Sequence, residues 1–223
     1  MQITHPFTSF IFVMDRSLSM ERLRQEAIDG FNTFVKKQKK RHRKKGGTVV
    51  LSLVQFNHTY EPLFYGVPIQ HVGKLNEHTY IPAGNTALFD AIALTVHGGV
   101  DYHARPSVTI PDKTIVAIMT DGEENASTEY REAKDVKATI KRAKKLHNWK
   151  FIFLASGIDD PFRYAQEMGI RRGETVSMSD SAGGMSSGYA VMDYAVAGMM
   201  DDDFDPDGEG VEIDDEGKVE PAK

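Results

Sequence analysis

Short apolar runs alternate along this chain with longer segments in which apolar residues recur every three to four positions. The short runs predict strands, and we expect six of them, at residues 9–14, 48–56, 60–69, 114–119, 149–155 and 174–178. The helical spacing of the other segments predicts helices at about 22–40, 86–96, 128–147, 162–168 and 186–200.

The order of these elements predicts the fold class. Strands that alternate with helices form a mostly parallel sheet with helices on both faces. The short link at Asn57 and His58 is typical of a hairpin, and Pro62 and Pro68 favour an edge position for the third strand. We therefore expect an α/β fold: a Rossmann-like, doubly wound, mostly parallel six-stranded sheet with one antiparallel edge strand.

Acidic residues are concentrated in the last segment of the sequence. Residues 201–223 contain seven Asp, four Glu and two Lys, a net charge of −9, so residues 1–200 carry +4 of the total of −5. The acidic segment has little apolar content with which to pack. We expect one domain over residues 1–200, followed by an acidic tail, 201–223, that is disordered unless it binds an ion or a partner.

Composition narrows the class of protein. Cysteine is absent, which excludes disulfides, zinc–thiolate sites and thiol nucleophiles. No apolar stretch approaches the ~20 residues that a membrane-spanning helix needs. These features fit a cytoplasmic protein that makes no membrane contact.

Oxygen-bearing side chains stand at three predicted loops. Asp15, Ser17 and Ser19 follow the first strand, Thr86 begins a predicted helix, and Asp121 follows the fourth strand. In a parallel sheet the carboxyl ends of the strands share one edge, where ligands bind, so we expect these loops to meet. Two carboxylates and three hydroxyls are hard ligands that suit Mg²⁺ or Mn²⁺. Each loop alone is more typical of a helix cap or a turn.

Taken in order, the three motifs resemble those of a known family. Asp-Arg-Ser-Leu-Ser at 15–19, Gly-Asn-Thr at 84–86 and Thr-Asp-Gly at 120–122 are similar to the metal-ion-dependent adhesion site of von Willebrand factor A (VWA) domains. The resemblance covers roughly residues 8–180. It departs from the family at Leu18 and Asn85, where a small residue or Gly is frequent, and neither departure removes a ligand.

The resemblance implies a protein-binding module and not an enzyme. Ser17 and Ser19 would bind the metal directly, Thr86 would join when a ligand is engaged, and Asp15 and Asp121 would often act through water. The metal would then coordinate an Asp or Glu of a partner protein. Intracellular members of the family often serve as adaptors, including partners of AAA-type ATPases or stress-response assemblies. We expect Arg16 and Glu123 to shape the rim of the site.

Enzymatic alternatives fit the first loop less well. It lacks the Gly-x-Gly-x-x-Gly pattern of dinucleotide-binding enzymes, and the chain has no P-loop. A haloacid-dehalogenase-like phosphatase would need a carboxylate where Ser17 stands. A metal-dependent hydrolase of phosphoryl substrates stays open as an alternative, with Glu123 or Glu124 as the base that the motifs supply.

The run from Lys36 to Lys45 carries eight Lys or Arg in ten residues. Such a run can bind nucleic acid, an anionic surface or the acidic tail of the same chain. It lacks interleaved aromatic residues, so it does not favour nucleic-acid binding, and a nucleic-acid-associated adaptor is the second alternative.

The acidic tail contains a further pattern. Asp203, Asp205, Asp207 and Gly208 fit the start of a calcium loop, with Asp214 at its twelfth position. The Asp in place of the usual Glu at that position argues against it. Weak Ca²⁺ binding by the tail is therefore a minor expectation.

Overall fold

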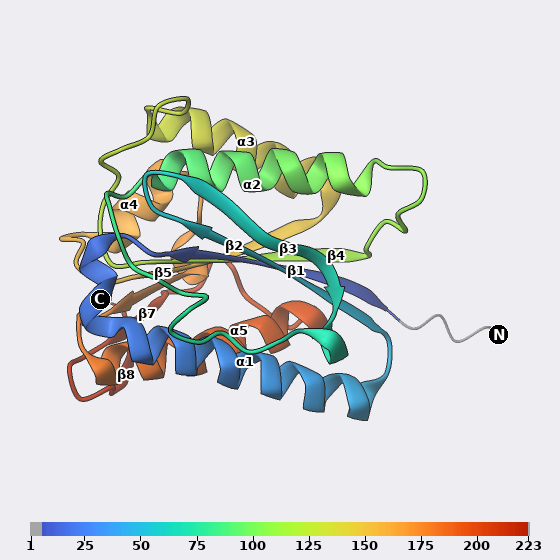
Figure 1. Cartoon of the computed structure of the whole chain (residues 1–223), viewed down its shortest axis with the longest axis horizontal. Coiled ribbons are helices and arrows are strands. Elements are labelled where there is room, and N and C mark those ends of the chain that lie inside the picture. The colour runs from blue at the N-terminus through green and yellow to red at the C-terminus, as the bar shows by residue number, and fades with distance from the viewer. Residues whose placement is uncertain (1–5, 223) are drawn as a thin grey trace.

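The computed structural model describes residues 6–222, which form one eight-stranded sheet with helices on both faces (Figure 1). The strands lie across the sheet in the order β3-β2-β1-β4-β5-β6-β7-β8. Their bounds are β1 (Phe7–Asp15), β2 (Thr48–Phe56), β3 (Tyr60–Pro68), β4 (Lys113–Thr120), β5 (Trp149–Ala155), β6 (Thr175–Met178), β7 (Val211–Ile213) and β8 (Val219–Pro221).

The helices form a layer on each face of this sheet. α1 and α5 cover one face, and α2, α3 and α4 cover the other (Figure 1). Their bounds are α1 (Arg24–Lys45), α2 (Leu88–His103), α3 (Ala133–His147), α4 (Pro161–Glu167) and α5 (Ala182–Asp201). No helix within residues 6–222 is both long and apolar enough to cross a membrane.

The predicted fold class is confirmed, and the predicted number of strands is wrong. β1 pairs in parallel with β2 and β4, the parallel pairing continues to β7, and β2–β3 is an antiparallel hairpin. The two additional strands, β7 and β8, come from the acidic segment, and β8 makes a second antiparallel edge. β3 is the edge strand that its prolines predicted.

The acidic segment extends the sheet because it offers a few apolar residues at the right positions. Val211 pairs with Val176 and Ile213 with Met178, and Ile213 is buried. Asp201 forms an ion pair with Lys45, so the basic run does contact an acidic residue of this segment. Within 201–222 the structure has a short parallel strand, β7, which forms a hairpin with β8.

β1 is buried on both faces because its residues are apolar at odd and even positions alike. Phe12 packs edge-on against Phe31 of α1, with ring centroids 5.5 Å apart, and stacks on Tyr189 of α5 at 6.0 Å. Ile11 and Val13 point to the opposite face, into the core beneath α2 and α3. This central strand therefore fixes the position of the loop that follows Asp15.

One predicted helix begins later than its spacing suggested. The carboxylate of Asp90 accepts backbone N–H groups from Thr128, Glu129 and Tyr130, at distances of 2.7 to 3.4 Å. Because those N–H groups are held by a side chain of α2, residues 128–132 form a loop, and α3 starts at Ala133. The same network holds the segment after β4 against the N-terminal end of α2.

Candidate metal centre

The candidate site lies where the strand order reverses. β1 has β2 on one side and β4 on the other, so the connections that leave their carboxyl ends diverge around the end of β1. Doubly wound sheets bind their ligands at such a switch point. Asp15 ends β1, and Thr120 ends β4 beside it.

The carboxylate of Asp15 is fully buried. Its Oδ1 accepts the backbone N–H of Ser17 at 2.6 Å, and its Oδ2 accepts the hydroxyl of Thr120 at 2.6 Å. Burial raises the pKa of Asp15 to about 7, although the bonds from Thr120 and Ser17 oppose the rise. Since no basic side chain within the described residues contacts it, the charged form lacks a compensating cation.

The two serines connect Asp15 to the loop after β4. The hydroxyls of Ser17 and Ser19 lie 3.1 Å apart, and Ser19 donates to Oδ1 of Asp121 at 2.7 Å. Ser17 and Asp121 are buried, whereas Ser19 faces solvent. Four of the five predicted ligands therefore form a continuous chain of contacts, in which the bond from Ser19 to Asp121 joins residues 102 positions apart.

Thr86 is held by the same loops through its backbone. Its N–H donates to Oδ1 of Asn125 at 2.9 Å, and its carbonyl accepts the N–H of Asn125 at 2.9 Å. The carbonyl of Gly84 accepts the N–H of Leu18 at 2.9 Å, which joins this loop to the first one. Within the described chain no hydrogen bond is recorded for the Thr86 hydroxyl, so the direct contacts do not extend to it.

Gly84 makes this loop geometry accessible. Its φ of 76° lies in the left-handed region, and a Cβ at this position would lie 2.2 Å from Nδ1 of His58. Gly at 84 therefore lets the Thr86 loop approach the first loop closely.

These residues fit a small, hard divalent cation. They supply two carboxylates and three hydroxyls, and the buried Asp15 carboxylate is the charge that a cation would compensate. Among residues 6–222, no group of three or more His, Asp or Glu side chains is placed to hold a metal. The three hydroxyls are neutral ligands, so the negative charge of the candidate ligand set comes from its two carboxylates.

Sequence reasoning missed two residues that shape the site. Arg22 donates to Oδ2 of Asp121 at 3.4 Å, to the carbonyl of Ser19 at 3.1 Å and to the carboxylate of Asp180. The buried hydroxyl of Tyr80 donates to the carbonyl of Asp15 at 2.5 Å. Neither belongs to a recognisable motif, and no signal in the sequence singles them out.

The predicted rim residues differ in their contacts. Arg16 pairs with Glu61 at 2.5 Å, and Glu123 is exposed. Leu18 is 65% exposed, so it stands at the rim without entering the site. The carboxylate of Glu124 holds the loop after β4, because it accepts the N–H groups of Phe89, Ala126 and Ser127.

The calcium pattern of the acidic segment is divided between two turns. Oδ1 of Asp205 accepts the N–H of Asp207, whose carboxylate lies 3.3 Å from the guanidinium of Arg171. Oδ1 of Asp214 instead accepts N–H groups within the β7–β8 turn. The carboxylates are thus used in separate turns and do not form one calcium loop.

The chain is a doubly wound α/β domain with carboxylates and hydroxyls gathered at its switch point. The class of protein is therefore a Rossmann-like domain with a candidate cation site. No protein-family model matches the chain, and no curated protein matches it. Solved structures do share the fold, at low sequence identity.

Three of these structures are a vWF domain, a VWA domain and a protein with a MIDAS motif. The vWF domain of the type V pili tip protein Mfa5 from Porphyromonas gingivalis has a TM-score of 0.59 at 12% identity, over 88% of this chain and 96% of that one. The SpRpn10 VWA domain has a TM-score of 0.57 at 13% identity, over 82% and 93%. Proximal thread matrix protein 1 from the mussel byssus, with a zinc-occupied MIDAS motif, has 0.58 at 15%, over 86% and 48%.

The chain therefore has the fold of a VWA domain. It spans about half the length of the mussel protein, 48% of that chain.

Proposed function

We propose that this chain is a metal-dependent protein-binding module. Mg²⁺ or Mn²⁺ is held by the five predicted ligands, Asp15, Ser17, Ser19, Thr86 and Asp121, and coordinates an Asp or Glu of a partner protein. The observation that carries the proposal is the chain of contacts from Asp15 through both serines to Asp121. The zinc-occupied MIDAS motif of the mussel protein supports a divalent cation on this fold.

The charge of the site favours capture of a carboxylate. Asp15 and Asp121 neutralise a divalent cation, and the guanidinium of Arg22 beside Asp121 adds a positive charge to the same region. An incoming carboxylate therefore meets a favourable potential and a hard cation that accepts oxygen ligands.

Hydrolysis of a phosphoryl substrate is the alternative, and it needs a general base near the metal. Glu124 accepts three backbone N–H groups and the hydroxyl of Ser127, so its carboxylate serves the loop. Glu123 is the base left for that alternative. We assign no reaction to the site.

Metal binding is tested first, by calorimetric titration of Mg²⁺ and Mn²⁺. Asp15→Asn keeps the shape of the buried side chain and removes its charge, so we expect affinity to fall at least about tenfold. Asp101→Asn, which changes an exposed carboxylate on α2, is the matched control and should bind as the wild type does. Equal metal affinity of the wild type and Asp15→Asn would contradict the proposed metal site.

Partner capture is tested separately. A protein recovered on the immobilised wild-type chain should be lost in EDTA and on Asp15→Asn, and retained on Asp101→Asn. An AAA-type ATPase or a stress-response protein is the partner that we expect, and the cysteine-free sequence supports the cytoplasm as its location. Phosphatase turnover that needs Mg²⁺ and Asp15 would instead establish the hydrolase.

A further inference from the structure

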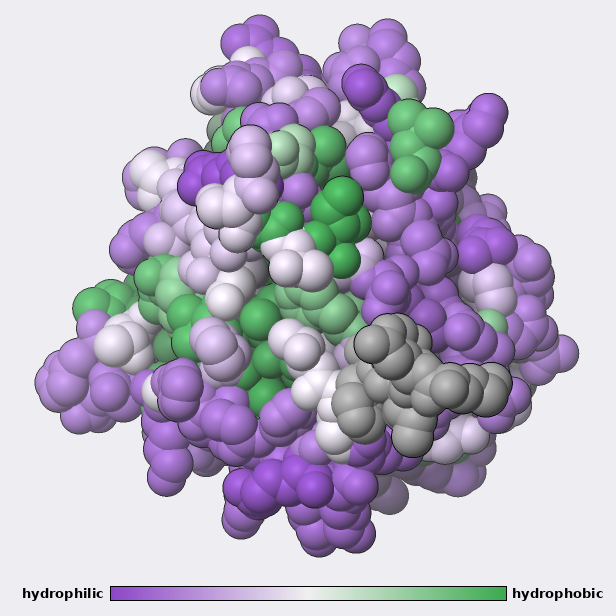
Figure 2. Space-filling view, turned by 90° about the vertical axis from the view of Figure 1, so that its right-hand side faces the viewer, coloured by the Kyte–Doolittle hydropathy of each residue, from purple (hydrophilic) through white to green (hydrophobic). Residues whose placement is uncertain are grey.

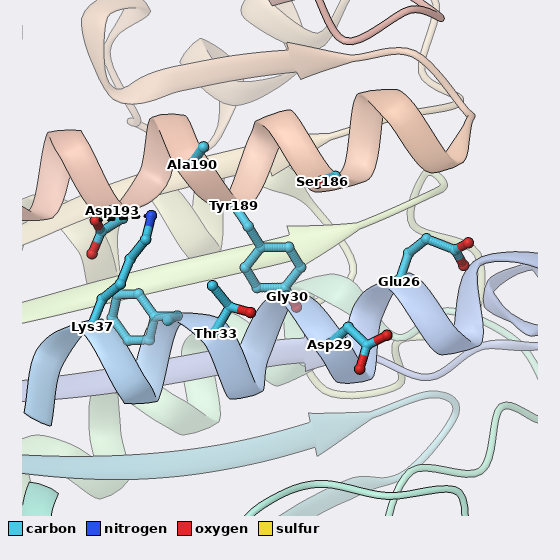
Figure 3. Close-up of a pocket in the computed structure, with 10 residues that line it drawn as sticks. Glu26, Asp29, Gly30, Thr33, Lys37, Ser186, Tyr189, Ala190 and Asp193 are labelled. Atoms are coloured by element: carbon cyan, nitrogen blue, oxygen red, sulfur yellow. Dashed lines mark ion pairs between the residues drawn. The ribbon is translucent and has the colours of Figure 1, made fainter.

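Six of the eight cations in the run from Lys36 to Lys45, near the C-terminal end of α1, fall into two groups. On the side facing α5, Lys37 and Arg41 lie 3.4 and 3.6 Å from the carboxylate of Asp193, and Lys45 pairs with Asp201 at 2.6 Å. Figure 3 shows Lys37 of α1 and Asp193 of α5 extending toward each other. The charge on this side of the helix is therefore largely neutralised within the fold.

The other side of α1 keeps its charge. Lys36, Lys39 and Arg43, with Lys74 from the segment after β3, line a groove of about 550 Å³. Within residues 6–222 no ion pair or hydrogen bond is recorded for the side chains of Lys36, Arg43 or Lys74. Asp29 is the one carboxylate in the lining, and it accepts a hydrogen bond from Gln25 at 3.0 Å.

The groove has a fixed wall. The ammonium group of Lys39 donates to the carbonyl of Val72 at 2.8 Å, which ties the segment at residues 72–74 to the helix. Val72 is buried, and the amide of Asn32 donates to the carbonyl of Leu75 at 2.9 Å. The cations of the helix and of this segment are thus held around one hollow.

We propose that this groove binds the phosphodiester backbone of nucleic acid. Lys36, Lys39 and Arg43 are three and four residues apart on one helix, so they rise in steps of about 4.5–6 Å. A regular row of cations suits a regular line of phosphates, which carry one charge per ~3.4 Å of axis on each strand. Asp29 is the one carboxylate in the lining, against four cations, and among residues 6–222 no ion pair joins it to them.

The lining also indicates how the backbone is bound. No aromatic side chain lines the groove, so it offers no platform on which bases stack. Contacts to phosphates alone fix position without reading sequence. An acidic protein would instead need apolar or aromatic anchor pockets, and Val35 and Val72 are the aliphatic residues available here.

The groove is remote from the candidate metal centre. α1 starts at Arg24, directly after the first metal loop, and at 1.5 Å per residue Lys36 and Arg43 lie about 18 and 28 Å further along the helix. In Figure 2 the end of α1 lies at the lower margin of the molecule, and this margin is strongly hydrophilic. A protein partner at the metal and a nucleic acid at the groove can be bound together.

Fluorescence anisotropy with a labelled random-sequence DNA duplex and its single strand tests the proposal. At low salt we expect binding to both, with a plot of log affinity against log salt of slope about −2 to −4 for three to four phosphate contacts. EDTA should not change it. Lys36→Gln, Arg43→Gln and Lys74→Gln together should weaken binding at least about tenfold and flatten the slope.

The control removes the same residue types from another exposed basic surface. Lys141→Gln, Arg142→Gln and Lys145→Gln on α3 should keep wild-type binding. Lys74→Gln alone lies outside any helix, so a partial loss of affinity there supports the groove without disturbing α1. The proposal is overturned by absence of binding at low salt, by an equal loss in the α3 variant, or by polyglutamate binding as tightly as DNA.

Discussion

The guanidinium of Arg22 donates to Oδ2 of Asp121 at 3.4 Å. The other carboxylate oxygen of Asp121, Oδ1, accepts a hydrogen bond from the hydroxyl of Ser19. Asp121 has no exposed side-chain surface, whereas Arg22 is half-exposed. The cation of Arg22 is thus placed where it repels a divalent metal and attracts a carboxylate.

Replacing Arg22 with Gln should therefore tighten metal binding. Removal of one positive charge beside a ligand carboxylate should raise Mg²⁺ affinity about 3- to 10-fold, which corresponds to roughly 1 kcal/mol. Calorimetric titration measures this, with Arg163→Gln on α4 as an exposed control. Weaker binding in Arg22→Gln would show that Arg22 acts chiefly by holding Asp121 in place.

Thr86 allows a test of the hydroxyl alone. Thr86→Val keeps the shape of the side chain and removes the oxygen, so Mg²⁺ affinity should fall about tenfold. Thr86→Ser restores the oxygen and should recover most of the affinity. Should Val and Ser behave alike in the titration, Thr86 is a packing residue and the ligand set has four members.

The meeting of the loops that carry Asp15 and Asp121 could be predicted from the sequence. Asp15 and Asp121 follow apolar runs, and a parallel sheet brings the ends of such strands to one edge. Arg22 and Tyr80 could not be predicted, since their roles depend on contacts across 99 and 65 residues that no motif encodes.

Tyr80 should stabilise the fold through its bond to the end of β1. Tyr80→Phe leaves the buried carbonyl of Asp15 without this donor, at a cost of about 1–2 kcal/mol. For a domain of this size the melting temperature should fall by about 2–8 °C. Tyr65→Phe is the control, because among residues 6–222 the Tyr65 hydroxyl bonds only the hydroxyl of Tyr60. An unchanged melting temperature would mean that water replaces the lost donor.

The acidic segment is the part of the fold that the sequence concealed. β7 has three residues, too few for a periodic signal, and the carboxylates around it dominate the composition. Its pairing depends on Val176 and Met178, which belong to a strand that is itself short. The charge pattern predicted disorder because local charge carries no information about pairing with a strand that is distant in the sequence.

Deleting residues 203–223 should consequently destabilise the domain. The deletion exposes the edge of β6 and removes the buried Ile213 from the core beside α5. Loss of that burial alone costs about 1.5–3 kcal/mol, so the melting temperature should fall by about 5 °C or more. Differential scanning fluorimetry measures it, and Ile213→Ser in the full chain should reproduce part of the drop. A truncated chain that melts with the full one would restore the prediction of a disordered tail.

Asp202 should give the stability a dependence on acid pH. Hydrogen bonds from Lys113 and Lys150, at 2.6 and 2.8 Å, lower the pKa of Asp202 from 3.8 to about 2. A group whose pKa is lowered on folding stabilises the fold above its unfolded pKa, and the contribution is lost as pH falls from about 4 toward 2.

The carboxylate is largely exposed, so solvent screening limits the effect. At neutral pH, Asp202→Asn should lower the free energy of unfolding by no more than about 1 kcal/mol. Asn tolerates the left-handed φ of 59° at this position, which isolates the charge from the backbone. Urea unfolding of both proteins, from neutral pH down to about 3, should show the two free energies converging as Asp202 becomes protonated. A difference that stays constant over this range would mean that the amide disrupts packing at the end of α5.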